Sequence, residues 1–371
     1  MKIKTITCHN VYNVGASLQA YALVKYLENE GHDVEIIDYM PWYLQHYRLF
    51  AINNSKYNKK IVRQIYILVK FPKRIKAKFS KRKRKYDWFT KKYLPLTSKC
   101  YLSNKELKEC PPEADIYFAG SDQIWNTIFQ NGKDPAFYLE FAPKKSIRAS
   151  YAASFATNDI IEEWKPQVRK WLTDMDYISV REKNGIDIIK KLGLQNIVHV
   201  LDPVFLLNKK EWVKIENEIS GIEPYILLYD FDDNIKMAEY SRQIAKENDW
   251  KLYSIFKNAY SDKSFEQEGP AEFLWLVHHA EFIVSNSFHA TAFSIIYEKQ
   301  FVVFPRKEAI NARMQELLKD LKLENQMLEE NIDGKNIPPK INYDYVRTVV
   351  EKKIHESKNY ISRVCEAKKA Q

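Results

Sequence analysis

The sequence lacks a run of apolar residues long enough to cross a membrane, which takes about 20. Its first ten residues, MKIKTITCHN, also lack the apolar core of a secretory signal peptide. Cysteine is scarce, and the four residues, Cys8, Cys100, Cys110 and Cys365, form no C-x-x-C pair and no metal-binding spacing. In a chain of this length, that pattern argues against a disulfide framework. We therefore expect a cytoplasmic protein with free thiols and no metal site.

Glycine is limited to nine residues, which excludes a collagen-like or glycine-rich low-complexity chain. Hydrophobic residues make up 45% of the sequence and aromatic residues 14%, as in a globular protein with a packed interior. At 371 residues the chain is longer than one hydrophobic core usually serves, so we expect two domains.

Acidic residues are almost missing from residues 56–92, which contain sixteen Lys and Arg against Asp87 alone. This segment carries a net charge of +15, whereas the remaining 42 basic and 47 acidic residues give −5. Ile65, Leu68 and Phe79 belong to an apolar pattern with helical spacing. Such basic amphipathic helices bind anionic membrane surfaces or phosphate groups. A solvated surface insertion is the alternative, and nucleic-acid binding is the least favoured interpretation.

Strand-like and helix-like segments alternate along the rest of the chain. Residues 3–8 predict a strand, residues 16–31 a helix that Gly31 ends, and residues 33–39 a second strand. Further strands are expected at 114–119, 147–155, 177–180, 196–201, 224–231, 251–256, 281–285 and 301–304, with helices at 181–193, 234–248, 270–279, from His289, and at 345–365. Strands separated by helix-length segments predict parallel sheets covered on both faces.

The alternation predicts an α/β fold of two Rossmann-like domains facing a cleft. Residues 1–175 form the first domain, with a basic helical insertion at 56–92, and residues 176–340 form the second. The last segment, residues 341–371, is expected to be a helix that packs back on the first domain.

Ligands of open α/β sheets bind beyond the carboxyl ends of the strands. Four polar loops follow predicted strands, namely NVGASLQ (13–19), GSDQIWN (120–126), VREKNG (180–185) and SNSFHA (285–290). The first loop lacks the G-x-G-x-x-G spacing, which argues against dinucleotide binding.

The order and wording of several motifs resemble the polysaccharide pyruvyl transferase family. These motifs are NVGASLQAYAL with GHDVEIIDY, GSDQIWN, YAASF, YISVREKNG, DPVFLL, and VSNSFHATAFSIIYEKQFVVF followed by NARMQELL, spread over residues 1–325. The resemblance implies a fold similar to GT-B glycosyltransferases. It also implies transfer of a pyruvyl group from phosphoenolpyruvate to two hydroxyls of a sugar, with formation of a cyclic ketal and release of phosphate. Phosphoenolpyruvate is then a co-substrate, and no other cofactor is expected.

The family's histidine corresponds to His289, which the resemblance makes the general acid. Protonation of the enol carbon requires a positioned acid, and histidine titrates near neutral pH. A helix N-terminus also favours the anionic donor. The same helix N-terminus lowers the pKa of His289 and so disfavours its protonated form. Binding of the doubly charged donor should raise this pKa again. A buried neutral histidine that donates to the backbone is the alternative.

The anionic donor needs cations and hydrogen-bond donors. The resemblance points to Arg181, Ser287, Lys307 and Arg313, with Arg306 beside Lys307. Arginine matches carboxylate and phosphate in a bidentate way. A salt bridge between Arg181 and Glu182 is the alternative for that residue. Many family members have an arginine at the position of Ser287. The residues that bind phosphoenolpyruvate in this chain therefore differ from the family pattern at this position.

The polar loops of the first domain are expected to bind the acceptor sugar. The candidates are Asn13, Gln19, Gln123, Trp125 and Asn126, with Asp122 as the base for the attacking hydroxyl. Alternatively, Asp122 closes a tight turn, Trp125 fills the core, and residues 13–19 form a plain strand-to-helix turn.

The acceptor expected from the resemblance is a galactose-type sugar in surface polysaccharide biosynthesis, either within a polysaccharide repeat or linked to a lipid pyrophosphate. Residues 56–92 would then bring the enzyme to an anionic membrane surface. Two other functions stay open. A nucleotide-sugar glycosyltransferase would have the same two-domain architecture. A non-catalytic basic binding protein would account for the positive charge of residues 56–92.

Overall fold

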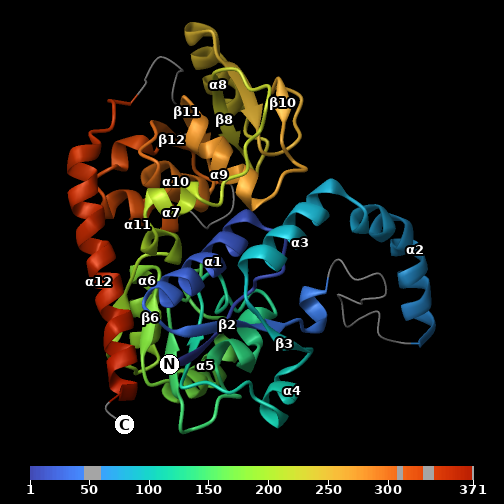
Figure 1. The fold of residues 1–371 in the computed structure, drawn as a ribbon, viewed down its shortest axis with the longest axis vertical. Helices are drawn as coiled ribbons and strands as arrows, with labels where there is room; N and C mark the ends of the chain where they lie inside the picture. Colours follow the sequence, from blue (N-terminus) through green and yellow to red (C-terminus); the bar gives the residue numbers. More distant parts are fainter. Residues whose placement is uncertain (46–59, 307–311, 329–337, 370–371) are drawn as a thin grey trace. The chain divides into compact units, whose positions relative to one another are not determined.

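The computed structural model describes residues 1–45, 60–306, 312–328 and 338–369, and the chain divides into two compact units (Figure 1). Unit 1 comprises Met1–Leu206 and His355–Gln371, and unit 2 comprises Leu207–Ile354. Within these described ranges, no helix combines the length and the apolar character that crossing a membrane requires. All four cysteines are free, as the sequence predicted.

Unit 1 is built on a five-stranded parallel sheet with the strand order β3-β2-β1-β4-β5. The strands are β1 (Lys2–Ile6), β2 (Asp33–Tyr39), β3 (Leu96–Tyr101), β4 (Ile116–Ala119) and β5 (Ile147–Ser150). The central strand β4 is buried on both faces and has the apolar sequence IYFA, whereas β1 also buries Lys4 and Thr5. Helix α1 (Val14–Asn29) starts where the side chain of Asn13 accepts the amide hydrogen of Ala16, and Gly31 follows the helix at φ 82°.

The sheet of unit 1 is extended by β6 (Ile178–Val180) and β7 (Ile197–His199), which pair with each other. Parallel bridges join Ala149 of β5 to Tyr177 and join Ala153 to Val180. Helices α5 (Lys165–Thr173) and α6 (Lys183–Lys191) flank β6 in the chain. Because these elements pack on β5, the division between the units falls after Leu206, not after residue 175 as the sequence predicted.

The C-terminal helix α12 (Tyr343–Lys369) contributes to both units. From His355 onward it belongs to unit 1, where the hydroxyl of Tyr360 donates to the carbonyl oxygen of Ser150 at 2.8 Å. The hydroxyl oxygen of Ser357 accepts the amide hydrogen of Leu201 at 3.0 Å. The predicted packing on the first domain therefore applies to the second half of this helix.

Unit 2 has a second five-stranded parallel sheet, with the order β10-β9-β8-β11-β12. The strands are β8 (Tyr225–Tyr229), β9 (Lys251–Ser254), β10 (Lys263–Ser264), β11 (Phe282–Ser285) and β12 (Phe301–Val303). The helices are α7 (Lys209–Val213), α8 (Ile235–Asn248), α9 (Pro270–His279), α10 (Phe288–Ile296) and α11 (Ala312–Asp320). The two sheets confirm the predicted α/β class with two Rossmann-like units. Their arrangement around a cleft stays a prediction.

The basic segment folds as α2 (Lys60–Lys78) and α3 (Lys81–Tyr93) and leads into β3, a strand that the sequence analysis did not identify. Residues 56–59 lie outside the described residues. Helix α3 is held on unit 1 by the buried Tyr86 and Phe89. Arg82 also donates to the carbonyl oxygen of Tyr12 at 2.9 Å. Helix α2 extends away from the rest of the unit (Figure 1).

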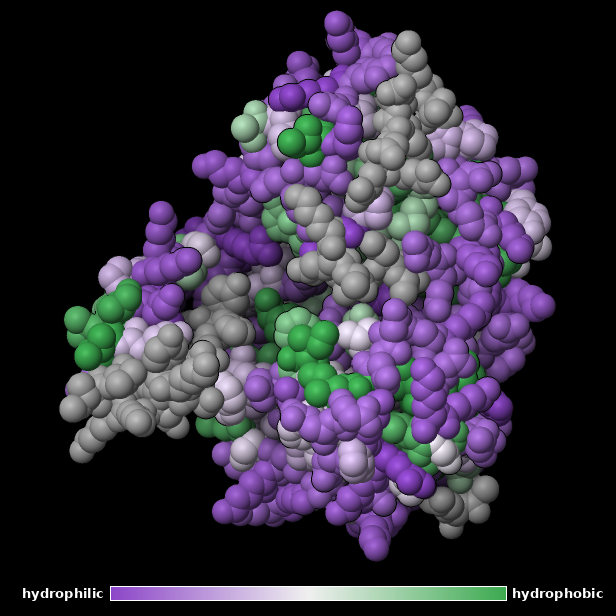
Figure 2. Space-filling view, turned by 180° about the vertical axis from the view of Figure 1, so that it is seen from behind, coloured by the Kyte–Doolittle hydropathy of each residue, from purple (hydrophilic) through white to green (hydrophobic). Residues whose placement is uncertain are grey.

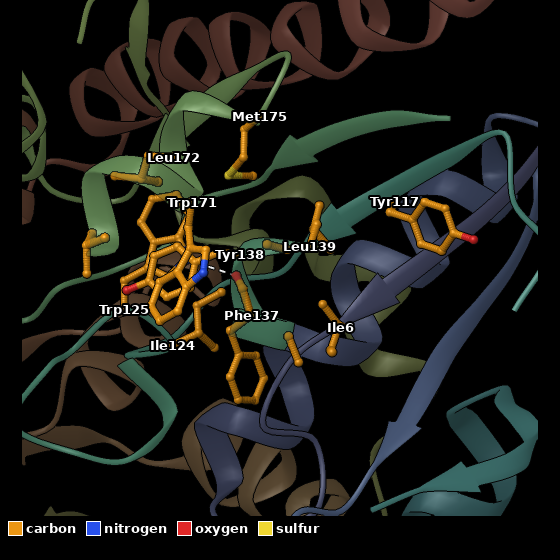
Figure 3. Close-up of a cluster of buried hydrophobic side chains, with 14 of the residues drawn as sticks. Ile6, Tyr117, Ile124, Trp125, Phe137, Tyr138, Leu139, Trp171, Leu172 and Met175 are labelled. Atoms are coloured by element: carbon orange, nitrogen blue, oxygen red, sulfur yellow. Dashed lines mark hydrogen bonds between the residues drawn. The ribbon is translucent and has the colours of Figure 1, made fainter. Parts of the chain in front are cut away.

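An aromatic core fixes the loops beyond β4 in unit 1 (Figure 3). The ring of Trp125 stacks on Tyr138, with centroids 5.5 Å apart, and Tyr138 stacks on Trp171 at 4.8 Å. The indole nitrogen of Trp125 donates to the carbonyl oxygen of Phe137 at 2.9 Å (Figure 3). This packing makes the loop after β4 a rigid part of the unit. Unit 1 also contains the short helix α4 (Asn104–Glu109).

Candidate functional site

The strand order of unit 2 reverses direction between β8 and β11, and two polar side chains meet at this point. Asp230 follows β8 and Asn286 follows β11, and both are buried. The amide nitrogen of the Asn286 side chain donates to Asp230 Oδ1 at 2.8 Å, and its oxygen accepts the amide hydrogen of Phe231 at 3.0 Å. Ligands of open α/β sheets bind at such switch points.

Asp230 organises the loop that follows β8. Its carboxylate accepts the amide hydrogens of Asp232 at 2.9 Å and Asn234 at 2.6 Å, and the hydroxyl of Tyr260 at 3.0 Å. Burial and the charge of Asp230 raise the pKa of Tyr260, so its hydroxyl keeps its proton. The loop is therefore fixed before any ligand arrives.

Helix α10 begins at the carboxyl end of β11 and carries His289 in its first turn. Ser287 is its N-cap, and its hydroxyl oxygen accepts the amide hydrogen of Ala290 at 3.4 Å. His289 is partly exposed, and its ring lies edge-on to Phe288 with centroids 5.3 Å apart. The positive end of the helix dipole lies here, which favours an anion.

Two arginines of unit 2 lie on aromatic side chains near these loops. The guanidinium of Arg306 lies 4.6 Å from the centre of the Phe231 ring and 3.3 Å from Asp232 Oδ1. The guanidinium of Arg313 lies 5.9 Å from the centre of the Phe288 ring, on the residue next to His289. Unit 2 thus combines a helix N-terminus, a histidine and two cations. Lys307 lies outside the described residues.

Arg181 lies in a buried charge cluster of unit 1, whereas the sequence predicted it within the second domain. Its guanidinium lies 2.7 Å from Asp202 Oδ2, 3.1 Å from Glu182 Oε1 and 3.8 Å from Asp122 Oδ1. Burial acts to lower the pKa of Arg181, but the three carboxylates outweigh it and raise the pKa. The side chain is 2% exposed. The salt bridge with Glu182, which was the alternative interpretation, is present. The predicted binding of the donor by Arg181 stays a prediction.

Asp122 is the most exposed member of this cluster. Its side chain is 22% exposed, it follows β4, and its backbone adopts a φ of 73°. Its carbonyl oxygen accepts the amide hydrogens of Ile124 at 2.7 Å and Ser154 at 3.1 Å. A carboxylate held at the carboxyl edge of the sheet can accept a proton from a hydroxyl group, and the predicted role as a base stays a prediction.

Three of the predicted sugar-binding residues are buried parts of the framework. Trp125 belongs to the aromatic core and cannot stack on a sugar, which confirms the alternative that it fills the core. The side-chain nitrogen of Gln19 donates to Thr7 Oγ1 at 2.9 Å and to the carbonyl oxygen of Ala16 at 3.1 Å. Asn126 is also buried, and its oxygen accepts the amide hydrogen of Ile128 at 3.0 Å.

Two of the predicted sugar-binding residues are more accessible. Asn13 caps α1 and is exposed. Gln123 is partly exposed, although its side-chain oxygen accepts from Asn126 at 3.1 Å. With Asp122, they are the predicted acceptor residues that a ligand of unit 1 can reach.

The sequence analysis missed two polar groups at strand ends. Asp230 lies inside the strand predicted at 224–231, but the observed strand β8 ends at Tyr229, so the misplaced strand end hid this residue. His9 follows β1, and its Nε2 lies 3.3 Å from Asp38 Oδ1, while its Nδ1 lies 3.3 Å from the carbonyl oxygen of Thr7. No spacing along the chain links His9 to Asp38, because the two strands meet only in the folded sheet.

The model of the polysaccharide pyruvyl transferase family matches residues 13–308. The match spans most of both units, and the chain belongs to this family. None of the curated protein sequences compared with it matches at a significant level.

Solved structures with a similar course of the chain include two UDP-GlcNAc 2-epimerases and a heptosyltransferase. The epimerase from Methanocaldococcus jannaschii has a TM-score of 0.48 and 13% identity, covering 95% of this chain and 92% of that one. The epimerase from Neisseria meningitidis, bound to UDP-GlcNAc, has a TM-score of 0.45 and 10% identity, with 95% and 99% covered. E. coli heptosyltransferase WaaC with ADP has a TM-score of 0.41 and 9% identity, with 95% and 100% covered. Likenesses at this level do not assign a substrate.

Proposed function

We propose that the protein transfers a pyruvyl group from phosphoenolpyruvate to two hydroxyls of a sugar and forms a cyclic ketal. Family membership supports a pyruvyl transferase acting on a polysaccharide. The observation that carries the choice of donor is His289 in the first turn of α10, in the same unit as Arg306 and Arg313. A helix N-terminus with two arginines suits a ligand that bears both phosphate and carboxylate.

The reaction needs an acid first and a base afterwards. His289 gives its proton to the methylene carbon of the enol, which becomes a methyl group, and the neighbouring carbon becomes electrophilic. A sugar hydroxyl attacks that carbon and loses its proton to a base. Phosphate then leaves, and a second hydroxyl attacks the same carbon and gives its proton to the neutral His289, which restores the acid and completes the ketal. One phosphoenolpyruvate and one diol thus give one ketal and one phosphate.

Asp122 is the proposed base for the attacking hydroxyl. It is a carboxylate at a strand end of unit 1 that remains partly exposed. Arg181 holds it in place together with Asp202 and Glu182, so Arg181 is a positioning residue in this proposal. Asn13 and Gln123 complete the proposed acceptor side, and Ser287 and Arg313 the proposed donor side.

The proposed acceptor is a galactose-type residue carried on a lipid pyrophosphate, which places the enzyme at a membrane surface. Helix α2 supports this because Ile65 and Leu68 on the helix and Phe79 directly after it are 60%, 77% and 69% exposed among lysines and arginines. Hydrophobic and hydrophilic surface lie side by side on this projecting helix (Figure 2). A basic helix with an exposed apolar stripe suits anionic lipid.

The experiment supplies phosphoenolpyruvate and a lipid-linked galactose-type acceptor to the purified full chain. We expect the acceptor to gain one pyruvyl ketal while one phosphate is released for each ketal. His289→Ala should abolish turnover while the donor still binds, and His355→Ala, an exposed histidine on α12, is the control with full activity. An H289A variant with near wild-type turnover would refute the acid assignment.

The same assay separates the two other functions. Consumption of a sugar nucleotide without any need for phosphoenolpyruvate would identify a glycosyltransferase. Tight, salt-sensitive binding of RNA or DNA with no turnover of either donor would identify a basic binding protein.

A further inference from the structure

Glu216, His278 and His279 form a cluster of metal-binding side chains in unit 2, at a place that the proposed reaction does not use. One ligand atom from each residue lies within 4.8 Å of the other two. Both histidines end α9, directly before β11, and Glu216 follows α7. The cluster therefore lies toward the amino end of β11, whereas Asn286 and His289 follow its carboxyl end.

Two of the three ligand groups already lie at the spacing that a bound metal needs. Nδ1 of His278 lies 3.1 Å from Oε1 of Glu216 and 3.2 Å from Oε2. Ligand atoms bound to tetrahedral zinc at about 2.0–2.1 Å are separated by about 3.3 Å. The side chains of His278 and Glu216 are only 22% and 7% exposed, so the pair is largely shielded from solvent.

Neighbouring rings orient the two imidazoles. His278 stacks on Tyr297 with centroids 4.6 Å apart, and His279 stacks on Trp275 at 4.3 Å. Nδ1 of His279 lies 2.9 Å from the carbonyl oxygen of Trp275, which makes Nδ1 the protonated nitrogen and leaves Nε2 for a metal.

We propose that Glu216, His278 and His279 bind one zinc-type divalent ion. Two imidazoles and one carboxylate are a donor set that suits zinc, and the fourth position is open to solvent beside the exposed His279. The ion joins the segment after α7, the end of α9 and, through the ring of Tyr297 that follows α10, the end of a third helix. Its role is to stabilise unit 2 and not to take part in pyruvyl transfer.

The test measures metal binding and stability on the full chain after removal of metal with a chelator. We expect one zinc per chain, a cobalt complex with the visible absorption of tetrahedral coordination, and a higher melting temperature with zinc. His279→Ala removes an exposed ligand and should leave the fold intact while weakening zinc binding at least about 100-fold, more than loss of an outer-shell partner costs. Glu216→Gln should have the same effect.

The matched control is His355→Ala, which removes an exposed histidine of unit 1. It should bind zinc like the wild type and show the same rise in melting temperature. Zinc that binds equally well to H279A and E216Q, or a wild type that binds none, would overturn the proposal. Neither variant alters His289, Asp122 or Arg313, so we expect both variants to transfer pyruvyl groups at the wild-type rate. A negative result for zinc binding would not bear on the proposed reaction, which the ketal assay tests separately.

Discussion

The burial of Arg181 changes the interpretation of its side chain. As a motif residue after a strand it resembled a ligand for an anion, yet three carboxylates surround it in unit 1. Buried charge clusters of this kind are stable only as complete sets, since each member offsets the desolvation of the others.

Replacing Arg181 with methionine should lower the free energy of unfolding by about 3–5 kcal/mol, because it leaves buried carboxylates without a countercharge. Chemical denaturation followed by circular dichroism measures this. Arg313→Met in unit 2 is the comparison, and it should change stability by less than about 1 kcal/mol but raise the KM for phosphoenolpyruvate. If R181M kept its stability and lost donor binding, the original assignment of Arg181 to the donor would stand.

The carboxyl group of Asp134 should make the stability of unit 1 depend on pH. Burial raises the pKa of its carboxyl group, although the hydroxyls of Tyr39 and Tyr43 both donate to Oδ2 at 2.6 Å and act in the opposite direction. In the unfolded chain the carboxyl ionises near pH ~4, so above that pH the folded state binds more protons at this group than the unfolded state. Its contribution to stability therefore falls as the pH rises.

The variant Asp134→Asn removes this titration. The difference in unfolding free energy, wild type minus D134N, should decrease from about pH 4 upward. Denaturation curves at a series of pH values give this difference directly. A difference that grows with pH would mean that the two tyrosines outweigh burial.

At the scale of elements, α2 and α3 share one charge pattern but differ in what they contact. Helix α3 buries Tyr86 and Phe89 in unit 1, whereas Ile65 and Leu68 of α2, and Phe79 directly after it, are exposed. Sequence spacing predicted both helices and their basic character. It did not separate the anchored helix from the exposed one, because this depends on which residues of unit 1 lie beneath them.

Changing Ile65, Leu68 and Phe79 together to glutamate should abolish binding to vesicles that contain anionic lipid. Each buried apolar side chain contributes about 1.5–3 kcal/mol at an interface, so binding should weaken well over 100-fold. Co-sedimentation with anionic and with neutral vesicles measures it. Ile128→Glu, at an exposed apolar residue of a loop in unit 1, is the control and should bind like the wild type. Equal binding of the triple variant would contradict the role of α2.

At the scale of the whole molecule, the two units are not two consecutive halves of the chain. The second half of α12 returns to unit 1, where Tyr360 is buried against Tyr151 with ring centroids 6.4 Å apart. The C-terminal residues are therefore part of the framework of unit 1.

Tyr360→Ala should lower the stability of unit 1 by about 3–5 kcal/mol, as for other large core residues. Hydrogen exchange should show lost protection in β5 and β6, next to the lost bond to Ser150, while β8 and β11 of unit 2 keep theirs. Tyr345→Ala, at an exposed residue of the same helix, should leave both units unchanged. Equal loss of protection in both units would show that they unfold as one.

Hydrophobic period, turn residues and motif order can be read along the chain, so they predicted the α/β class, most of the strands and helices, the basic helices and the family. The elements β3, β10, α4, α5 and α7 were not predicted. His289 on the first turn of its helix and Asp122 after its strand are also local, and both lie where the sequence placed them. Tertiary packing buries Trp125 and Asn126, makes Arg181 part of unit 1 and brings His9 next to Asp38, and no local pattern shows these outcomes. It also brought Glu216 to His278, 62 residues apart. Burial and long-range partners arise from how the elements pack, and residues distant in the chain become neighbours only when the sheets are formed.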